Sequence, residues 1–269
     1  MPRPRVHGFT AAIAFTATFA LTALTALTAC SGGGPAADGA TTPPPAAPVN
    51  APGLTCVEDF PDAQAVRFGP GETIGGLSFG EGPRALVLLH QSNGDLCQWA
   101  PYAAELGEAG YRALAIDAPR VGSSRDAAKG NHLAVLEALT YLRAEGATAV
   151  TLVGASMGGT AVLAAAPQAA PPVDGVIALS APTFYDGTDA LEAVPALTAP
   201  VLYAAAEGDA QFGDNAVKFE AATPAATDKT LVLVDGSHHG VDFLEPDAGP
   251  EDVKVRKAVE DFLAAHMPL

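Results

Sequence analysis

The hydrophobic pattern from Leu54 onward alternates short apolar runs with longer stretches of helical periodicity. Short, mostly apolar runs predict strands, and the continuous runs at 85–89 and 150–153 are typical of strands buried on both faces of a sheet. The predicted strands lie at 66–68, 74–79, 85–89, 111–116, 150–153, 176–179, 201–205 and 231–234. Helices are predicted between them at 96–109, 132–145, 157–166, 211–222 and 251–266. Regular alternation of strand and helix implies an α/β fold with a mostly parallel central sheet and helices on both faces.

A serine at a strand-to-helix turn is the first candidate for chemistry. The pattern G-x-S-x-G occurs twice, around Ser78 and around Ser156. A nucleophilic serine in such a turn needs glycine-sized residues two positions before and after it, because the tight backbone brings them together. Ser156 follows a buried strand and precedes a helix, whereas Ser78 lies inside a predicted strand with no helix after it. Ser156 is therefore the predicted nucleophile.

With these features, the chain from about Arg67 to Leu269 resembles the α/β-hydrolase superfamily, and within it the esterases and dienelactone hydrolases that lack a lid. The resemblance implies an α/β-hydrolase fold without a cap domain, because only about residues 181–200 separate the strand after the nucleophile helix from the next strand. That segment is long enough for a loop and one short helix. The superfamily presents its nucleophile, acid and base in that order along the chain.

The acid and the base implied by the resemblance follow two later strands. Asp209 in Glu207-Gly208-Asp209 matches the acid, and Glu207 is the alternative. His239, which precedes Gly240 as in the family's His-Gly step, matches the base, and His238 is the alternative. In such a triad, the imidazole takes the serine proton while the carboxylate fixes the imidazole tautomer.

The loop after strand 85–89 departs from the family's His-Gly-x pattern, because it reads His90-Gln91-Ser92. By alignment, the backbone N–H groups of Ser92 and Met157 would form the oxyanion hole, with the Gln91 N–H as the alternative to Ser92. His90 is expected to bond the loop backbone rather than to take part in the reaction.

The first thirty residues are typical of an export signal. Arg3 and Arg5 precede an uncharged apolar stretch. Leu27-Thr28-Ala29-Cys30 resembles the bacterial lipobox, which implies a lipoprotein signal peptide over 1–30 and a lipid on Cys30. An uncleaved anchor or an ordinary signal peptide is the alternative. A Gly/Pro/Ala-rich tether over 31–53 would then hold the catalytic domain, 54–269, at the extracytoplasmic face of the cell membrane.

Composition excludes several other classes of protein. Thirty acidic and 14 basic residues give a formal net charge of −16, which opposes binding to nucleic acid. No cysteine pair has zinc-site spacing and no third histidine accompanies His238 and His239, so no metal is predicted. Export to an oxidising compartment favours a disulfide between Cys56 and Cys97, and two buried free thiols are the alternative.

Together these features predict a serine hydrolase that cleaves carboxylic esters or thioesters through an acyl-enzyme, without a cofactor. Its substrate would be a small-molecule or polymeric ester, and its contact with the membrane would be through the N-terminal lipid. A serine peptidase on the same fold and a noncatalytic envelope binding protein are the alternatives.

Overall fold

The computed structural model describes residues 54–269 except 129, 247 and 248. The predicted signal peptide (1–30) with its lipidation residue Cys30, and the predicted tether (31–53), lie outside the described residues. Among the described residues, no helix has the length and apolar character needed to cross a membrane.

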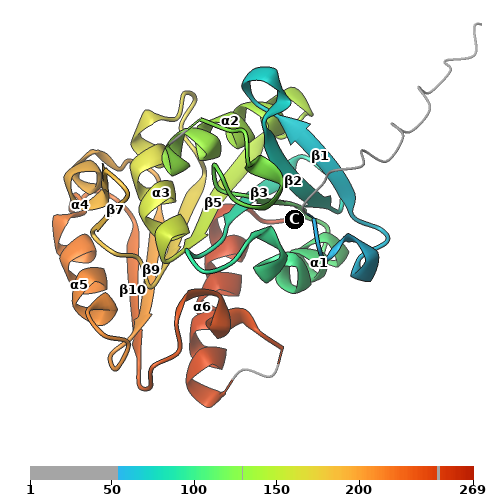
Figure 1. Ribbon diagram of the computed structural model, residues 1–269. Coiled ribbons are helices and arrows are strands. Elements are labelled where there is room, and N and C mark those ends of the chain that lie inside the picture. The colour runs from blue at the N-terminus through green and yellow to red at the C-terminus, as the bar shows by residue number, and fades with distance from the viewer. Residues whose placement is uncertain (1–53, 129, 247–248) are drawn as a thin grey trace, which may run out of the picture. The chain divides into compact units, whose positions relative to one another are not determined.

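The framework of the described chain is an eight-stranded sheet with the order β1-β2-β4-β3-β5-β6-β9-β10 (Figure 1). Its strands are β1 (Gln64–Phe68), β2 (Ile74–Phe79), β3 (Arg84–Leu89), β4 (Arg112–Ile116), β5 (Ala149–Ala155), β6 (Gly175–Leu179), β9 (Val201–Ala206) and β10 (Lys229–Val234). All pairings from β4 through β3, β5, β6 and β9 to β10 are parallel, and β2 is antiparallel to both of its neighbours. The predicted mostly parallel sheet is therefore confirmed.

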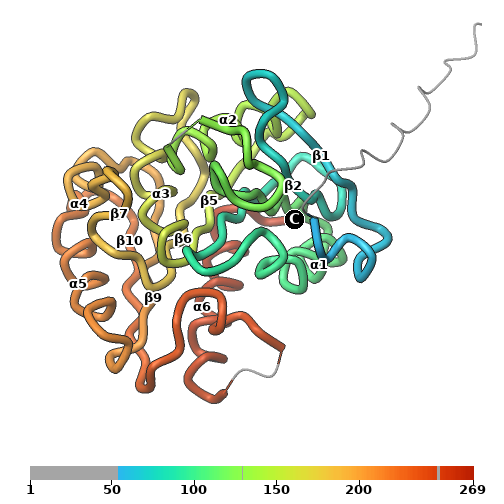
Figure 2. The backbone as a smooth tube through the Cα atoms, in the orientation of Figure 1, coloured from blue at the N-terminus to red at the C-terminus, as the bar shows by residue number. Residues whose placement is uncertain are grey.

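Helices cover both faces of this sheet (Figure 1). One face carries α1 (Ala100–Glu108) and α6 (Pro250–His266), and the other carries α2 (Asn131–Ala144), α3 (Met157–Ala165) and α5 (Phe212–Ala222). Figure 2 follows the chain from β1 and β2 in blue, at one end of the sheet, to β9 and β10 in orange at the other.

The apolar run in β3 shows why the sheet is buried on both sides. Val87 and Leu89 belong to the core beneath α2, α3 and α5, whereas Leu86 and Leu88 belong to the core beneath α1 and α6. Successive strand residues point to opposite faces, so both sets must be apolar when helices cover both faces.

Two local features differ from the predicted elements. The helix expected at 96–109 divides at Trp99 into a 3-10 turn, Leu96–Gln98, and α1, which has Pro101 in its first turn. The segment 181–200 contains α4 (Ala190–Ala193), as expected, but also an unpredicted hairpin of β7 (Phe184–Tyr185) and β8 (Thr188–Asp189). Strands of two residues are too short to produce a periodic signal.

Candidate active site

Ser156 lies in the sharp turn between β5 and α3. Its φ of 49° and ψ of −115° place it in a strained region that few non-glycine residues adopt. A side chain at Gly154 would collide with the Gly158 carbonyl, and one at Gly158 would collide with the Leu89 carbonyl. The glycines at these two positions therefore permit the turn, whereas Ser78 lies within the regular strand β2.

The side chains of His239 and Asp209 meet at the carboxyl ends of two neighbouring parallel strands. Asp209 follows β9 and His239 follows β10. His239 Nδ1 and Asp209 Oδ2 are 2.6 Å apart, and the ring of Phe212 packs on the imidazole at a centroid distance of 4.6 Å. A carboxylate that accepts the Nδ1 proton leaves the imidazole Nε2 able to accept another proton.

The two alternatives for acid and base occupy different surroundings. His238 is paired through Nδ1 with Asp252 Oδ2 at 2.7 Å, not with Asp209. Glu207 is exposed to solvent, whereas Asp209 is largely buried, with 11% of its side chain exposed. The structure thus gives each histidine its own carboxylate.

Backbone packing holds the loop of His239 against the turn of Ser156. The Gly240 N–H donates at 3.1 Å to the Oγ atom of Ser180, the residue directly after β6. A Cβ atom on Gly240 would lie 3.0 Å from the Cβ atom of Ala155. Gly240 follows His239, and Ala155 precedes Ser156. The side chains of His239 and Ser156 therefore start from adjoining stretches of backbone.

Within the described residues, no hydrogen bond joins Ser156 Oγ to His239. Catalytic hydrogen bonds are often long or poorly aligned without substrate and shorten when substrate binds. Ser156 is buried, with 8% of its surface exposed, and directly follows β5 at the carboxyl edge of the sheet.

The loop after β3 adjoins the turn of Ser156, because a side chain at Gly158 would collide with the Leu89 and His90 carbonyls. The Gln91 N–H donates to the side-chain oxygen of Gln98 at 3.3 Å. Ser92, the next residue, is exposed. Met157 is the first residue of α3, where backbone N–H groups have no partner within the helix. Helix N-termini of this kind stabilise negative charge.

His90 supports this loop from within the protein. It is fully buried, its Nδ1 donates to the Gln91 carbonyl at 2.7 Å, and its Nε2 accepts the Ala118 N–H at 3.0 Å. Burial lowers the pKa of His90, and the Gln91 carbonyl and the charge of Asp117 oppose this shift without cancelling it. Because Nε2 accepts a backbone N–H, the ring is bonded as a neutral imidazole, and it bonds loop backbone as expected from the sequence.

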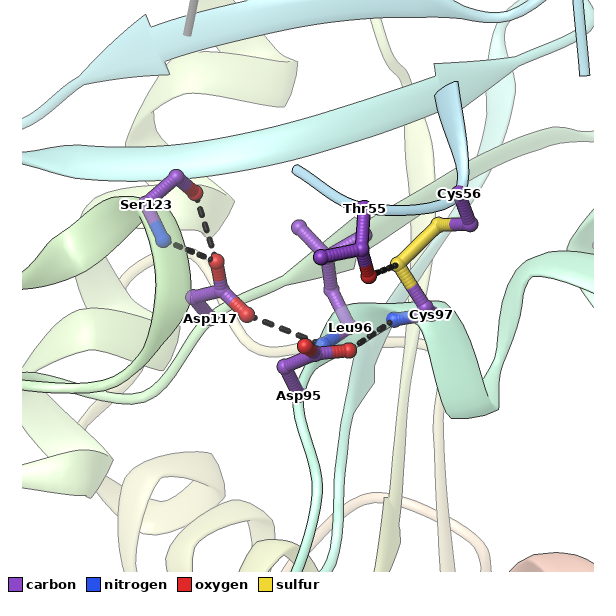
Figure 3. The surroundings of a disulfide bond; sticks show 7 residues. All are labelled: Thr55, Cys56, Asp95, Leu96, Cys97, Asp117 and Ser123. Carbon is purple, nitrogen blue, oxygen red and sulfur yellow. Dashed lines mark hydrogen bonds between the residues drawn. A yellow bond between two sulfur atoms is a disulfide. The ribbon is translucent and has the colours of Figure 1, made fainter. Parts of the chain in front are cut away.

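Asp117 ties the loop after β3 to the loop after β4 (Figure 3). One carboxylate oxygen accepts the Leu96 N–H at 2.9 Å, and the other accepts both the N–H and the hydroxyl of Ser123 at 2.6 Å. Burial raises the pKa of Asp117, while these hydrogen bonds act in the opposite direction. The arrangement fixes the start of the 3-10 turn Leu96–Gln98, which follows the loop after β3.

A disulfide between Cys56 and Cys97 joins this 3-10 turn, Leu96–Gln98, to the N-terminal segment of the described chain (Figure 3). The Cys97 N–H donates to Asp95 Oδ1 at 2.9 Å, which caps the turn. The bridge spans 41 positions of sequence and links the first described residues to the 3-10 turn after the loop that follows β3.

Three residues of this region carried no functional prediction from sequence: Ser180, Phe212 and Gln98. Ser180 directly follows the parallel strand β6 at the same edge as the other candidate site residues, so the rule that sites lie beyond the carboxyl ends of strands indicates its position. Gln98 and Phe212 gave no such signal, because their contacts arise only from tertiary packing. Trp99 is fully buried beside Tyr102 and belongs to the core.

Comparison with known proteins agrees with this architecture. The sequence profile of the alpha/beta hydrolase fold matches residues 84–216. The chain has the α/β-hydrolase fold. A search of curated protein sequences finds no match.

Several solved structures share this α/β-hydrolase fold at low sequence identity. An esterase from Pyrococcus furiosus is 16% identical, with a TM-score of 0.63 over 78% of this chain and 93% of that chain. A dienelactone hydrolase from Anabaena variabilis is 21% identical, with a TM-score of 0.59 over 76% and 97%. A monoacylglycerol lipase from Paleococcus ferrophilus is 17% identical, with a TM-score of 0.58 over 71% and 98%.

Proposed function

We propose that this protein is a serine hydrolase that cleaves carboxylic esters, thioesters included, through an acyl-enzyme on Ser156. The observation that carries the proposal is the 2.6 Å contact between His239 Nδ1 and Asp209 Oδ2, in a loop packed against the strained Ser156 turn. A nucleophile, a base and a group that orients the base are the elements of a catalytic triad.

In the proposed mechanism, His239 Nε2 takes the hydroxyl proton of Ser156 as Oγ attacks the ester carbonyl carbon. Asp209 stabilises the imidazolium that forms, which then gives its proton to the departing alcohol. Water repeats the sequence on the acyl-enzyme and releases the acid. The oxyanion of each tetrahedral intermediate would accept hydrogen bonds from the N–H groups of Met157 and Ser92.

Ser92 is the better candidate for the second donor because the Gln91 N–H is already bonded to Gln98. A backbone N–H that is bonded within the protein must break that bond before it can stabilise an oxyanion. Ser92 is exposed and lies in the same loop, and its backbone N–H donates no hydrogen bond among the described residues.

Two further observations support ester bonds as the substrate class. Structures with this fold include proteins named esterase, monoacylglycerol lipase and dienelactone hydrolase. The segment between β6 and β9 holds only the short hairpin, α4 and one 3-10 turn, so it supplies no helical cap domain. A site without such a cap remains open to bulky as well as small esters.

The test is turnover of a short-chain p-nitrophenyl ester by purified residues 54–269, with Ser156→Ala as the matched variant. Wild-type protein should release nitrophenolate, and the variant should lose at least about 10³-fold in kcat. Equal rates in the two proteins would remove Ser156 from the mechanism.

We further propose that the protein is a lipoprotein, lipidated on Cys30 and held at the extracytoplasmic face of the cell membrane. The Cys56–Cys97 disulfide suits such an oxidising location. Mass analysis of membrane-extracted protein should find an acylated Cys30 as the mature N-terminus. An unmodified Cys30, or a mature N-terminus elsewhere, would contradict the lipid anchor.

A further inference from the structure

Gln91 occupies the position where the related loop has glycine, and its side chain contacts a distant segment. The residue is buried, with 7% of its surface exposed. Its Oε1 accepts the Val241 N–H at 3.2 Å, across 150 positions of sequence. A side chain at Gly240 would collide with the same oxygen, so glycine there leaves room for the amide. A glycine at position 91 could not form this contact.

The backbone of Gln91 is hydrogen-bonded through both its N–H and its carbonyl. Its N–H donates to Gln98 Oε1 at 3.3 Å, and its carbonyl accepts from His90 Nδ1 at 2.7 Å and from the Gly94 N–H at 3.3 Å. Gln98 directly follows Cys97, which is bonded to Cys56. The oxyanion loop is thus fixed to the disulfide on one side and to the loop of His239 on the other.

We propose that Gln91 is a positioning residue that couples the oxyanion loop to the base loop. Its side chain acts through Val241 on the backbone that carries His239, and its backbone sets the direction of the neighbouring Ser92 N–H. This inference rests on the proposed function. It adds that the buried amide of Gln91 holds the base and the oxyanion donor at a fixed separation. The sequence pattern alone shows only that Gln91 replaces a glycine.

The contact predicts a particular kinetic effect. Gln91→Met keeps the length of the side chain and removes the acceptor, so the Val241 N–H is left without its partner. We expect kcat to fall about 10- to 100-fold, because small displacements of reacting groups are costly in the transition state. KM should change less than about threefold, because ground-state binding does not use the alignment.

Two further variants separate positioning from packing. Gln91→Glu retains an acceptor for the Val241 N–H and should restore most of the kcat that Gln91→Met loses. Gln168→Met is the matched control, since the Gln168 amide bonds only the Ala164 carbonyl at the end of α3. It should leave both kcat and KM unchanged. Thermal unfolding of each variant checks that the comparison is made between folded proteins.

Hydrogen exchange tests the same contact without using activity. The Val241 amide should exchange at least about tenfold faster in Gln91→Met than in wild type, and at the wild-type rate in Gln168→Met. Unchanged exchange and unchanged kcat in Gln91→Met would overturn the proposal, as would a loss of kcat that Gln91→Glu does not restore. Absence of ester turnover in wild type would instead contradict the proposed function, and the exchange of Val241 would still decide whether Gln91 couples the two loops.

Discussion

Two adjacent histidines form two His–Asp pairs of nearly identical geometry. His239 Nδ1 lies 2.6 Å from Asp209, and His238 Nδ1 lies 2.7 Å from Asp252. Their surroundings differ: 26% of the His239 side chain is exposed, against 57% for His238. A hydrogen bond between imidazole and carboxylate is therefore not sufficient to identify a catalytic base.

What separates the pairs is the backbone that each one joins. Gly240 packs the loop of His239 against Ala155, which directly precedes Ser156. Asp252 also accepts the Gly249 N–H at 2.8 Å, so the pair of His238 belongs to the start of α6. In the proposed mechanism the first pair transfers protons to and from Ser156, whereas the second caps a helix terminus.

The largest expected effect distinguishes the two histidines directly. His239→Ala should lower kcat for ester hydrolysis by at least about 10³-fold, because Ser156 loses the base that takes its proton. His238→Ala should remain within a few fold of wild type. Steady-state kinetics on the same ester measures both variants. An active His239 variant together with an inactive His238 variant would reverse the assignment.

Substitution of Asp209 should lower activity, whereas substitution of Asp252 should lower stability. Asp209→Asn should lower kcat by about 10³- to 10⁴-fold, because the amide no longer holds the imidazole tautomer. Asp252→Asn should leave kcat within a few fold and reduce the free energy of unfolding by about 1–2 kcal/mol, since a buried cap is weakened. Kinetics and urea unfolding of each variant provide the two measurements. A large loss of activity in Asp252→Asn alone would contradict the comparison.

A smaller effect concerns the pH dependence of stability that the buried His90 produces. Burial lowers its folded pKa below the unfolded value. As pH falls below about 6.5, the unfolded chain therefore binds a proton that the folded protein does not, and stability declines toward the folded pKa. His90→Gln should remove part of this decline, by at most about 1.4 kcal/mol per pH unit. Urea unfolding of wild type and variant between pH 7.5 and 5.5 compares the slopes, and parallel slopes would refute this assignment.

The sequence predicted most of the sheet because its signals are local. The alternation of Leu86, Val87, Leu88 and Leu89 between two cores appears in the chain as one apolar run. The turn at Ser156 is equally local, since Gly154 and Gly158 relieve contacts within a few residues of it.

The remaining features depend on contacts between distant segments. The two adjacent histidines do not by themselves indicate which ring contacts Asp209. The partner of His238 is Asp252 on α6, and the position of that helix depends on tertiary packing. The bond from Val241 to Gln91 joins residues 150 positions apart. The resemblance to a family marked Gln91 as a departure, and only the fold gives its side chain a partner.

Covalent labelling with a fluorophosphonate, located by peptide mass analysis, tests the role of His239 most directly. One label, on Ser156, is expected in wild type and in His238→Ala. No label is expected in Ser156→Ala, and labelling in His239→Ala should be slower by at least about 10²-fold, because the probe requires an activated serine. A label on another residue such as Ser78, no label on wild type, or equal labelling of the two histidine variants would contradict the central claim that His239, and not His238, activates Ser156.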